Sequence, residues 1–242
     1  MTPNEFVSLL NVQDLSISEE QLDIFKKYLD FLIAYNKKIN LTSITDPGEI
    51  WTKHFYDSIT PLIYLPIENE KFSMIDVGSG AGFPGIPMKI VNNGIKLTLL
   101  DATKKKVDFL NKLSFQLNFS SLNILHGRAE ELGQQRKYRA KFDFAIARGV
   151  AQTNVLLELL LPFVKVGGKV VLMKSVYDED EIYKAHRALS ELGGRVSQSF
   201  SFELPNGDPR ALIVVDKLKR TKLRYPRRPG VPKHSPLGGK NI

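Results

Sequence analysis

A glycine-rich turn directly after an apolar run is the feature that most constrains this chain. Residues 76–85 read Asp-Val-Gly-Ser-Gly-Ala-Gly-Phe-Pro-Gly and follow the run at 72–75. Glycine lets a backbone turn sharply and pass close to a nucleotide-like ligand, because no side chain fills the space where the ligand must lie. We therefore take Gly78, Gly80 and Gly82 as candidate ligand-binding positions. The segment predicts a strand, a binding turn and then a helix.

A second apolar run, residues 97–100, ends in an acidic residue. Asp101 follows Gly78 by 23 positions. In doubly wound folds this is the place from which a carboxylate accepts hydrogen bonds from ribose hydroxyls. The turn and the acid together predict a bound adenosine. The alternative, an ordinary loop that happens to be rich in glycine, explains neither the preceding strand nor the spacing of the acid.

After a helical first part, strand-like and helical patterns alternate along the chain. Strand-like runs occupy 72–77, 96–100, 121–125, 142–147 and 169–174, and helical patterns occupy 103–118 and 155–164. Such alternation predicts a parallel sheet with helices on both faces. Two later strand-like runs, 196–203 and 211–216, flank Pro205-Asn206-Gly207-Asp208, which is a strong hairpin signal. The last strand is therefore expected to be antiparallel.

The first seventy residues are expected to form a helical cap. Residues 2–5 and 18–21 fit capping boxes, and residues 46–49 resemble a third helix start. Apolar side chains recur at helical spacing after the second box, at Leu22, Phe25, Leu29, Leu32 and Ile39. We expect three parts: a cap at 1–70, a ligand-binding core at 71–217 and a basic tail at 218–242.

The positive charge is concentrated near the end of the sequence. The chain has 34 basic and 26 acidic residues, but nine of the basic residues and none of the acidic ones lie in 217–242. The remainder, 25 basic and 26 acidic residues, is almost neutral. A basic segment with an interleaved tyrosine suits a polyanion such as RNA. A solubilising, disordered segment is the alternative, and charge alone does not decide between the two.

Composition excludes several classes of protein and site. There are no cysteines, which removes disulfides, thiolate metal sites and thiol nucleophiles, and suits a cytoplasmic protein. The first residues do not resemble a signal peptide, and no stretch approaches the ~18 apolar residues of a membrane span. Three of the four histidines are too scattered to pair as ligands, so no metal site is predicted. Nothing in the sequence requires more than a monomer.

Longer motifs resemble one known family. The chain is similar to class I S-adenosylmethionine-dependent methyltransferases, which have a Rossmann-like fold, and within them to the RsmG family, also called GidB. The matching stretches are 40–42, 54–58, 75–87, 100–105, 127–131, 147–151 and 225–230. The resemblance implies methylation at N7 of a guanine, position 527, in bacterial 16S ribosomal RNA. The implied partners are this RNA or the small ribosomal subunit.

The same resemblance implies roles for matching residues. S-adenosylmethionine is expected to lie against the turn and the loops after the second and third strands, with contacts from Gly78, Gly80, Gly82, Phe83, Asp101, Ala102, Thr103, Ala129 and Glu130. Arg148, at the end of the fourth strand, is implied to be catalytic and to lie nearest the methyl donor and the target base. A plain core side chain is the alternative for Phe83, and a solvated charge at a helix start is the alternative for Glu130. His54 and Asp57 stay outside the predicted site, because a structural hydrogen bond explains them equally well.

The reaction implied by the resemblance agrees with the residue types and motifs that this sequence lacks. Guanine N7 presents a free lone pair, so positioning suffices and no general base is needed. Attack at a pyrimidine C5 would need a cysteine, and methylation of an exocyclic amine would be expected to show a Pro-Pro-aromatic run, where residues 145–149 read Ala-Ile-Ala-Arg-Gly. Two rivals remain. One is a nicotinamide-dependent oxidoreductase, and the other is a non-catalytic RNA-binding or ribosome assembly factor with a nucleotide pocket.

Overall fold

The computed structural model describes residues 1–67, 71–119, 122–149 and 151–239. Its centre is a seven-stranded sheet of order β3-β2-β1-β4-β5-β7-β6. The strands are β1 (Ser73–Val77), β2 (Lys96–Asp101), β3 (Asn123–His126), β4 (Phe142–Arg148), β5 (Val164–Lys174), β6 (Gly194–Glu203) and β7 (Pro209–Lys217). The first five in sequence are parallel, and β7 is antiparallel to both β5 and β6. The predicted α/β fold with an antiparallel last strand is confirmed.

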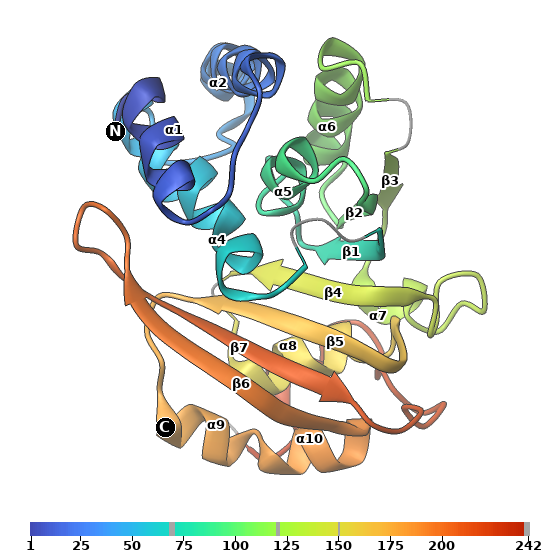
Figure 1. The fold of residues 1–242 in the computed structure, drawn as a ribbon. Helices are drawn as coiled ribbons and strands as arrows, with labels where there is room; N and C mark the ends of the chain where they lie inside the picture. The colour runs from blue at the N-terminus through green and yellow to red at the C-terminus, as the bar shows by residue number, and fades with distance from the viewer. Residues whose placement is uncertain (68–70, 120–121, 150, 240–242) are drawn as a thin grey trace.

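Helices cover both faces of the sheet (Figure 1). On one face lie α1 (Pro3–Val12), α2 (Glu19–Ile39), α3 (Pro47–Glu49), the π-helix η1 (Ile50–Tyr56), α4 (Asp57–Tyr64), α5 (Gly85–Val91) and α6 (Lys104–Gln116). On the other face lie α7 (Ala129–Leu132), α8 (Thr153–Leu160), α9 (Glu179–Lys184), α10 (His186–Leu192) and α11 (Val231–His234). In the described part of the chain, none of the helices combines the length and apolar character needed to cross a bilayer.

The central strands are apolar on both sides, because each side faces a different core. In β4, Phe144 and Ile146 pack into the core shared with the first helices, while Ala145 and Ala147 pack into the core under α8 and α10. Successive side chains of a strand point to opposite faces. A parallel sheet covered on both faces therefore reads as an unbroken apolar run rather than an alternating one.

Residues 1–67, which we call the cap, join the first core through aromatic side chains. Both predicted capping boxes are present, at Thr2 and at Ser18. Phe25 lies 5.1 Å from Phe6 and 5.1 Å from Phe55, measured between ring centres, and is fully buried. Trp51 completes this cluster. The cap is thus built into the core and does not merely rest on it.

Some predicted boundaries were wrong. The helix expected at 155–164 ends at Leu160, and Val164 begins β5 instead. Pro162 explains the early end, since proline has no N–H to continue the helical hydrogen bonds. The hairpin at 205–208 is confirmed, with Leu204 N–H donating to the Asp208 carbonyl at 2.9 Å. The strand expected at 121–125 is observed at Asn123–His126, and Ser121 lies outside the described residues.

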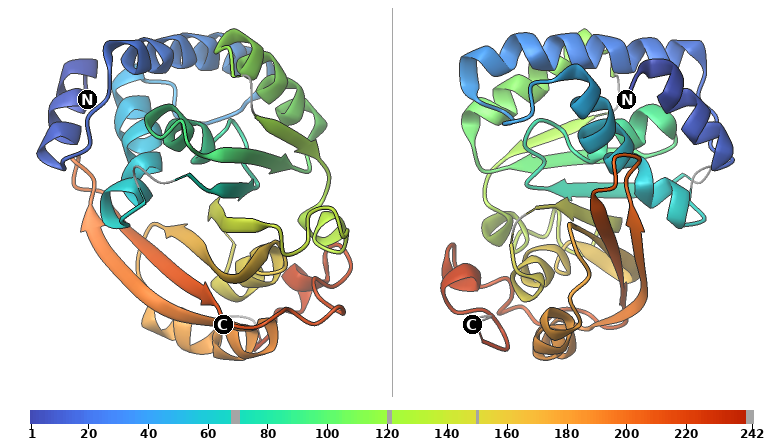
Figure 2. Two further views of the ribbon diagram at one scale, coloured as in Figure 1. Left: turned by 45° about the vertical axis from the view of Figure 1, so that its right-hand side comes forward. Right: turned by 90° about the vertical axis from the view of Figure 1, so that its left-hand side faces the viewer.

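Residues 218–239, which we call the tail, lie against the helices that cover the second face of the sheet (Figure 2). Tyr225 is buried there, and the Arg139 guanidinium donates to the backbone carbonyls of Thr221, Lys222 and Tyr225 at 2.7–3.0 Å. The described tail is therefore packed against the body. This differs from the alternative of a solubilising, disordered segment. Lys240 lies outside the described residues.

Candidate functional site

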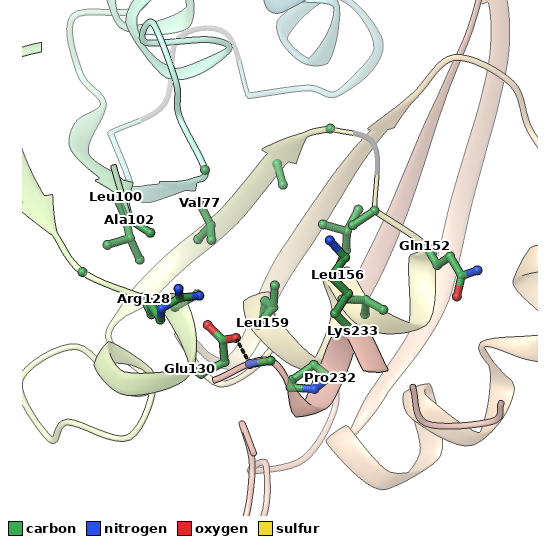
Figure 3. A pocket seen from close by; sticks show the side chains of 18 of the residues that line it. Val77, Leu100, Ala102, Arg128, Glu130, Gln152, Leu156, Leu159, Pro232 and Lys233 are labelled. Carbon is green, nitrogen blue, oxygen red and sulfur yellow. Dashed lines mark hydrogen bonds between the residues drawn. The ribbon is translucent and has the colours of Figure 1, made fainter. Parts of the chain in front are cut away.

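A cavity of about 600 Å³ opens at the carboxyl ends of the parallel strands (Figure 3). This is the edge at which open α/β sheets bind their ligands. Its walls come from the ends of β1 and β2, the turn before α7, the end of β4, helix α8 and the tail. The lining is mostly apolar, with charged side chains from Arg128, Glu130, Arg148 and Lys233. An apolar cavity with a few polar groups is the common form of a small-molecule site.

Half of the predicted site residues line this cavity. They come from four segments far apart in sequence: Gly78, Ala102, Ala129 with Glu130, and Arg148. The other predicted residues do not line it: Gly80, Gly82, Phe83, Asp101 and Thr103. The structure thus brings the first set together around one space and leaves the second set outside its lining.

Glycine is needed at Gly78 and at Gly82 for different structural reasons. Gly78 has φ +78°, and a Cβ there would meet no atom within 4 Å, so the space above it is open to the cavity. Gly82 has φ +101°, and a Cβ there would lie 2.6 Å from Ile86 Cδ1 and 2.8 Å from the Tyr28 hydroxyl. Gly82 is therefore required by close packing against the cap. Of the three predicted glycines, Gly78 is the one that lines the cavity with no atom near the place of a Cβ.

Asp101 holds the turn in place. Its side chain is buried at 6% exposure, with Oδ2 accepting from Gly80 N–H at 2.9 Å and Oδ1 accepting from Thr103 N–H at 2.8 Å. The carboxylate therefore bridges the loop after β1 to the loop after β2. Each carboxylate oxygen can accept a further hydrogen bond, so this role is compatible with the predicted contact to a ribose.

Phe83 joins the turn to the cap. Its ring stacks on His54 at 4.5 Å and on Tyr28 at 5.4 Å between ring centres, and the Arg148 guanidinium carbon lies 5.0 Å from its centre. The Tyr28 hydroxyl donates to the carbonyl of Ala81 in the same turn at 2.5 Å. These contacts tie the position of the turn to that of α2 and η1.

Arg148 crosses from the cavity to the cap. It is the last residue of β4, and its guanidinium nitrogen Nη1 donates to Asp57 Oδ2 and to Ser58 Oγ, both at 3.2 Å. The second nitrogen, Nη2, lies 3.1 Å from His54 Nδ1. Asp57 also pairs with Arg210 of β7, again at 3.2 Å. One buried carboxylate thus joins the cap, the fourth strand and the last strand.

His54 is held in its neutral form. Because Arg148 Nη2 has only hydrogens to offer, His54 Nδ1 must be the acceptor, which leaves the ring proton on Nε2 to donate to Thr42 Oγ1 at 2.8 Å. Burial, and secondarily the positive charge of Arg148, lowers the pKa of His54 to about 3. Sequence reasoning left His54 and Asp57 out of the site. The matching run 54–58 was the signal that could have included them.

The tail supplies part of the cavity wall, which sequence reasoning also missed. Glu130 Oε1 accepts from Gly230 N–H at 3.1 Å, a contact drawn in Figure 3, and Pro232 and Lys233 line the cavity beside it. Gly230 has φ +85°, a left-handed conformation that favours glycine. The run 225–230 is one of the matching stretches, but nothing in the sequence places it near Glu130.

A buried ion pair fixes the tail at this position. Glu158 of α8 is fully buried, and it accepts from the Arg227 guanidinium at 2.6 and 2.8 Å and from the Arg227 N–H at 2.9 Å. Arg227 therefore serves the fold and is not available to a polyanion. Arg224 and Lys222 similarly pair with Glu191.

Comparisons with known proteins identify relatives over the whole chain. The family model described as "rRNA small subunit methyltransferase G" (GidB) matches residues 21–207. A protein of Oenococcus oeni named "Ribosomal RNA small subunit methyltransferase G" is 61% identical over 241 residues, which covers 100% of both chains. One of the same name from Leuconostoc citreum is 45% identical over 238 residues, covering 98% of this chain and 100% of the other.

Solved structures show the same fold at low sequence identity. A SAM-dependent methyltransferase from Aquifex aeolicus superposes with a TM-score of 0.52 and 17% identity, covering 76% of this chain and 97% of the other. A Haloferax volcanii methyltransferase in complex with the Trm112 activator gives a TM-score of 0.56 and 14% identity, covering 78% of this chain and 98% of the other. At such identities the likeness establishes the architecture alone.

Proposed function

This chain belongs to the family of rRNA small subunit methyltransferase G, and from that premise we propose that it transfers a methyl group from S-adenosylmethionine to N7 of the guanine at position 527 in 16S rRNA. The observation that carries the proposal is the 61% identity over the whole chain to a protein of that name. The cavity at the carboxyl edge of the sheet supports it, because this is where the donor would have to bind.

The residues present fit S-adenosylmethionine. The volume of about 600 Å³ lies in the usual range for a ligand of this size, roughly 300–1,000 Å³. The open space above Gly78 allows close approach to the main chain.

Individual residues would hold separate parts of the donor. Asp101 would accept from the ribose hydroxyls while it keeps its two bonds to the turn. Ala102 and Ala129 would form the apolar walls beside the adenine, and Glu130 would offer a carboxylate oxygen at its edge. Gly78 would contribute the bare backbone. S-adenosylmethionine supplies a methyl group already activated on a cationic sulfur.

The chain's own task is to position the acceptor. Guanine N7 needs no proton removed, so alignment of the two reactants carries the catalysis. Arg148 would help to position the acceptor base, since it lies at the end of β4 and lines the cavity. Asp57 lies 3.2 Å from the guanidinium and is shared with Arg210, so its single negative charge lowers the positive charge beside a cationic donor without cancelling it. The hydrogen bonds to Asp57, Ser58 and His54 also fix the orientation of the Arg148 side chain.

The proposal is tested by transfer of labelled methyl to small ribosomal subunits that lack the modification, with free 16S rRNA in parallel. The product is mapped by cleavage at N7-methylguanine. Label at position 527 supports the proposal. Donor binding without transfer to either substrate would contradict it and favour the assembly-factor alternative. Binding of NADH in place of S-adenosylmethionine would favour the oxidoreductase.

Variants of Arg148 test its proposed role. Arg148→Ala is expected to lower turnover by roughly 100-fold, while the Kd for S-adenosylmethionine changes much less. Because this change also removes hydrogen bonds to the cap, Arg148→Lys is measured beside it, and both are compared at temperatures where unfolding curves show them folded. Unchanged turnover in Arg148→Ala would remove Arg148 from the mechanism.

A further inference from the structure

A second concave region lies at the opposite edge of the sheet from the donor cavity. This groove, of about 720 Å³, is formed by the loop that leads into β4, the start of β5 and the first residues after β7. Its basic side chains are Arg136, Arg139, Lys141, Lys165, Lys217, Arg220 and Lys222. No acidic side chain is among the residues that line it.

Most of this positive charge is not cancelled by neighbouring carboxylates. Lys165 pairs with Asp143, and Lys222 pairs with Glu191. Arg139 instead donates to backbone carbonyls. Lys217 is buried and donates to the Leu192 carbonyl and the Thr221 hydroxyl, and burial lowers its pKa to about 7, so it adds little to the charge of the groove. Within the described ranges, the remaining members Arg136, Lys141 and Arg220 have no ion-pair partner. Like charges gathered in a groove repel one another, and a bound anion relieves that repulsion.

The walls of the groove distinguish between kinds of anion. The lining contains no aromatic side chain on which an unpaired base could stack, and its uncharged part is small and aliphatic, as at Val164 and Val166. Single-stranded RNA is usually held by aromatic stacking, whereas helical RNA is held through its phosphates and riboses. The groove therefore has the chemistry of a backbone contact and lacks that of base recognition.

Strand β4 sets the separation between the groove and the donor cavity. Lys141, directly before β4, lines the groove, and Arg148, at its end, lines the cavity. Seven residue steps at about 3.3 Å each place these two positions about 23 Å apart. A single nucleotide cannot reach both, so a ligand that occupies both must be a polymer.

We propose that this groove binds the phosphate backbone of a helical segment of the substrate RNA, about 23 Å from the guanine that is methylated. The inference rests on the proposed function for the identity of the RNA, but it adds a second contact on the far edge of the sheet. The enzyme would then hold its substrate from both ends of β4.

The test neutralises three exposed groove residues in one variant, Arg136→Gln, Lys141→Gln and Arg220→Gln. The matched control carries Lys27→Gln, Lys37→Gln and Lys38→Gln, which remove three exposed charges from α2 on the cap. Unfolding curves and the Kd for S-adenosylmethionine must match the parent in both. The binding of deproteinised 16S rRNA and of small subunits is then measured across a salt series.

The proposal expects the groove variant to bind both RNA substrates at least 10-fold more weakly at 50 mM salt. The slope of log K against log salt should also fall by about 2 to 3, since each phosphate contact contributes roughly 0.9. The control should differ from the parent by less than twofold. Equal binding by groove variant and parent would overturn the proposal. A loss seen with small subunits but not with deproteinised RNA would also overturn it and indicate a ribosomal protein as the partner.

Because the readout is binding, the proposal can fail separately from the proposed function. If the parent binds RNA but transfers no methyl group, the proposed reaction is wrong, and the groove is still judged by the binding of its variant. If transfer occurs and the groove variant matches the parent in both affinity and salt slope, the reaction stands and the groove contact is wrong.

Discussion

The tail lines the donor cavity and the cap holds Arg148 at its wall, but the two are attached to the body by different forces. The cap is held by buried rings such as Phe25 and Trp51, which share one core with the sheet. The tail is held mainly by directional polar bonds, above all those between Glu158 and Arg227 and those from Arg139. Apolar burial is spread over many contacts, whereas a polar attachment depends on each partner. The cap should therefore be inseparable from the fold, and the tail should be separable by a single change.

Trp51→Ala should have the largest effect, a loss of about 3–5 kcal/mol in the free energy of unfolding, because it removes the centre of the aromatic cluster. Urea unfolding followed by circular dichroism measures it. Phe115→Ala is the control, since that ring is 85% exposed, and it should change stability by less than about 0.5 kcal/mol. A loss below about 1 kcal/mol in Trp51→Ala would mean that the cap is only loosely attached.

Glu158→Ala should cost about 3 kcal/mol, because it leaves Arg227 without its buried partner. It should also free the tail, so that trypsin cleaves there before the body. Glu191→Ala removes the partner of two exposed cations, Lys222 and Arg224, and should cost less than about 1 kcal/mol. Equal protease resistance in Glu158→Ala and the parent would show that apolar contacts, not this ion pair, hold the tail.

Acid should weaken the junction between the cap and Arg148. His54 has a folded-state pKa of about 3, below its ordinary value of about 6.5, so between these values the unfolded state binds more protons. Stability due to this group is complete above pH 6.5 and falls with decreasing pH by at most about 1.4 kcal/mol per unit. Between pH 6.5 and 5 the loss should reach about 1.6 kcal/mol.

The variant His54→Asn provides the comparison, since it cannot be protonated in this range. The difference in unfolding free energy between parent and variant should shrink as the pH falls from 6.5 to 5. Parallel curves for the two proteins would show that His54 is not buried in its neutral form.

Gly230→Ala should have the smallest effect on stability, about 1–2 kcal/mol, because alanine is strained at φ +85°. It should also weaken binding of S-adenosylmethionine, since Gly230 donates to Glu130 at the cavity wall. Gly207→Ala is a matched control, with φ +82° at the distant hairpin and open space around the new methyl. The control should lose similar stability with no change in donor Kd. Equal donor affinity in both variants would remove the tail from the binding site.

The features that could be predicted from the sequence are those that residues close together in the chain determine. The turn around Gly78, the placement of Asp101, both capping boxes and the hairpin before Asp208 all follow from local spacing. The pairing of Arg148 with Asp57 and that of Glu130 with Gly230 join residues about 90 to 100 positions apart. No periodicity encodes such contacts, and they depend on the packing of complete layers. The basic groove is of the same kind, since three separate segments contribute its cations.

The donor cavity draws its walls from residues as far apart as Val77 and Lys233. A ligand that binds there therefore binds the complete native chain and not a partly folded piece of it. By linkage, occupancy raises the free energy of unfolding of the whole molecule, by about 2.7 kcal/mol at a ligand concentration 100 times its Kd. The melting temperature would accordingly rise with the concentration of S-adenosylmethionine. In a cell the lifetime of the protein would then follow the supply of its own substrate.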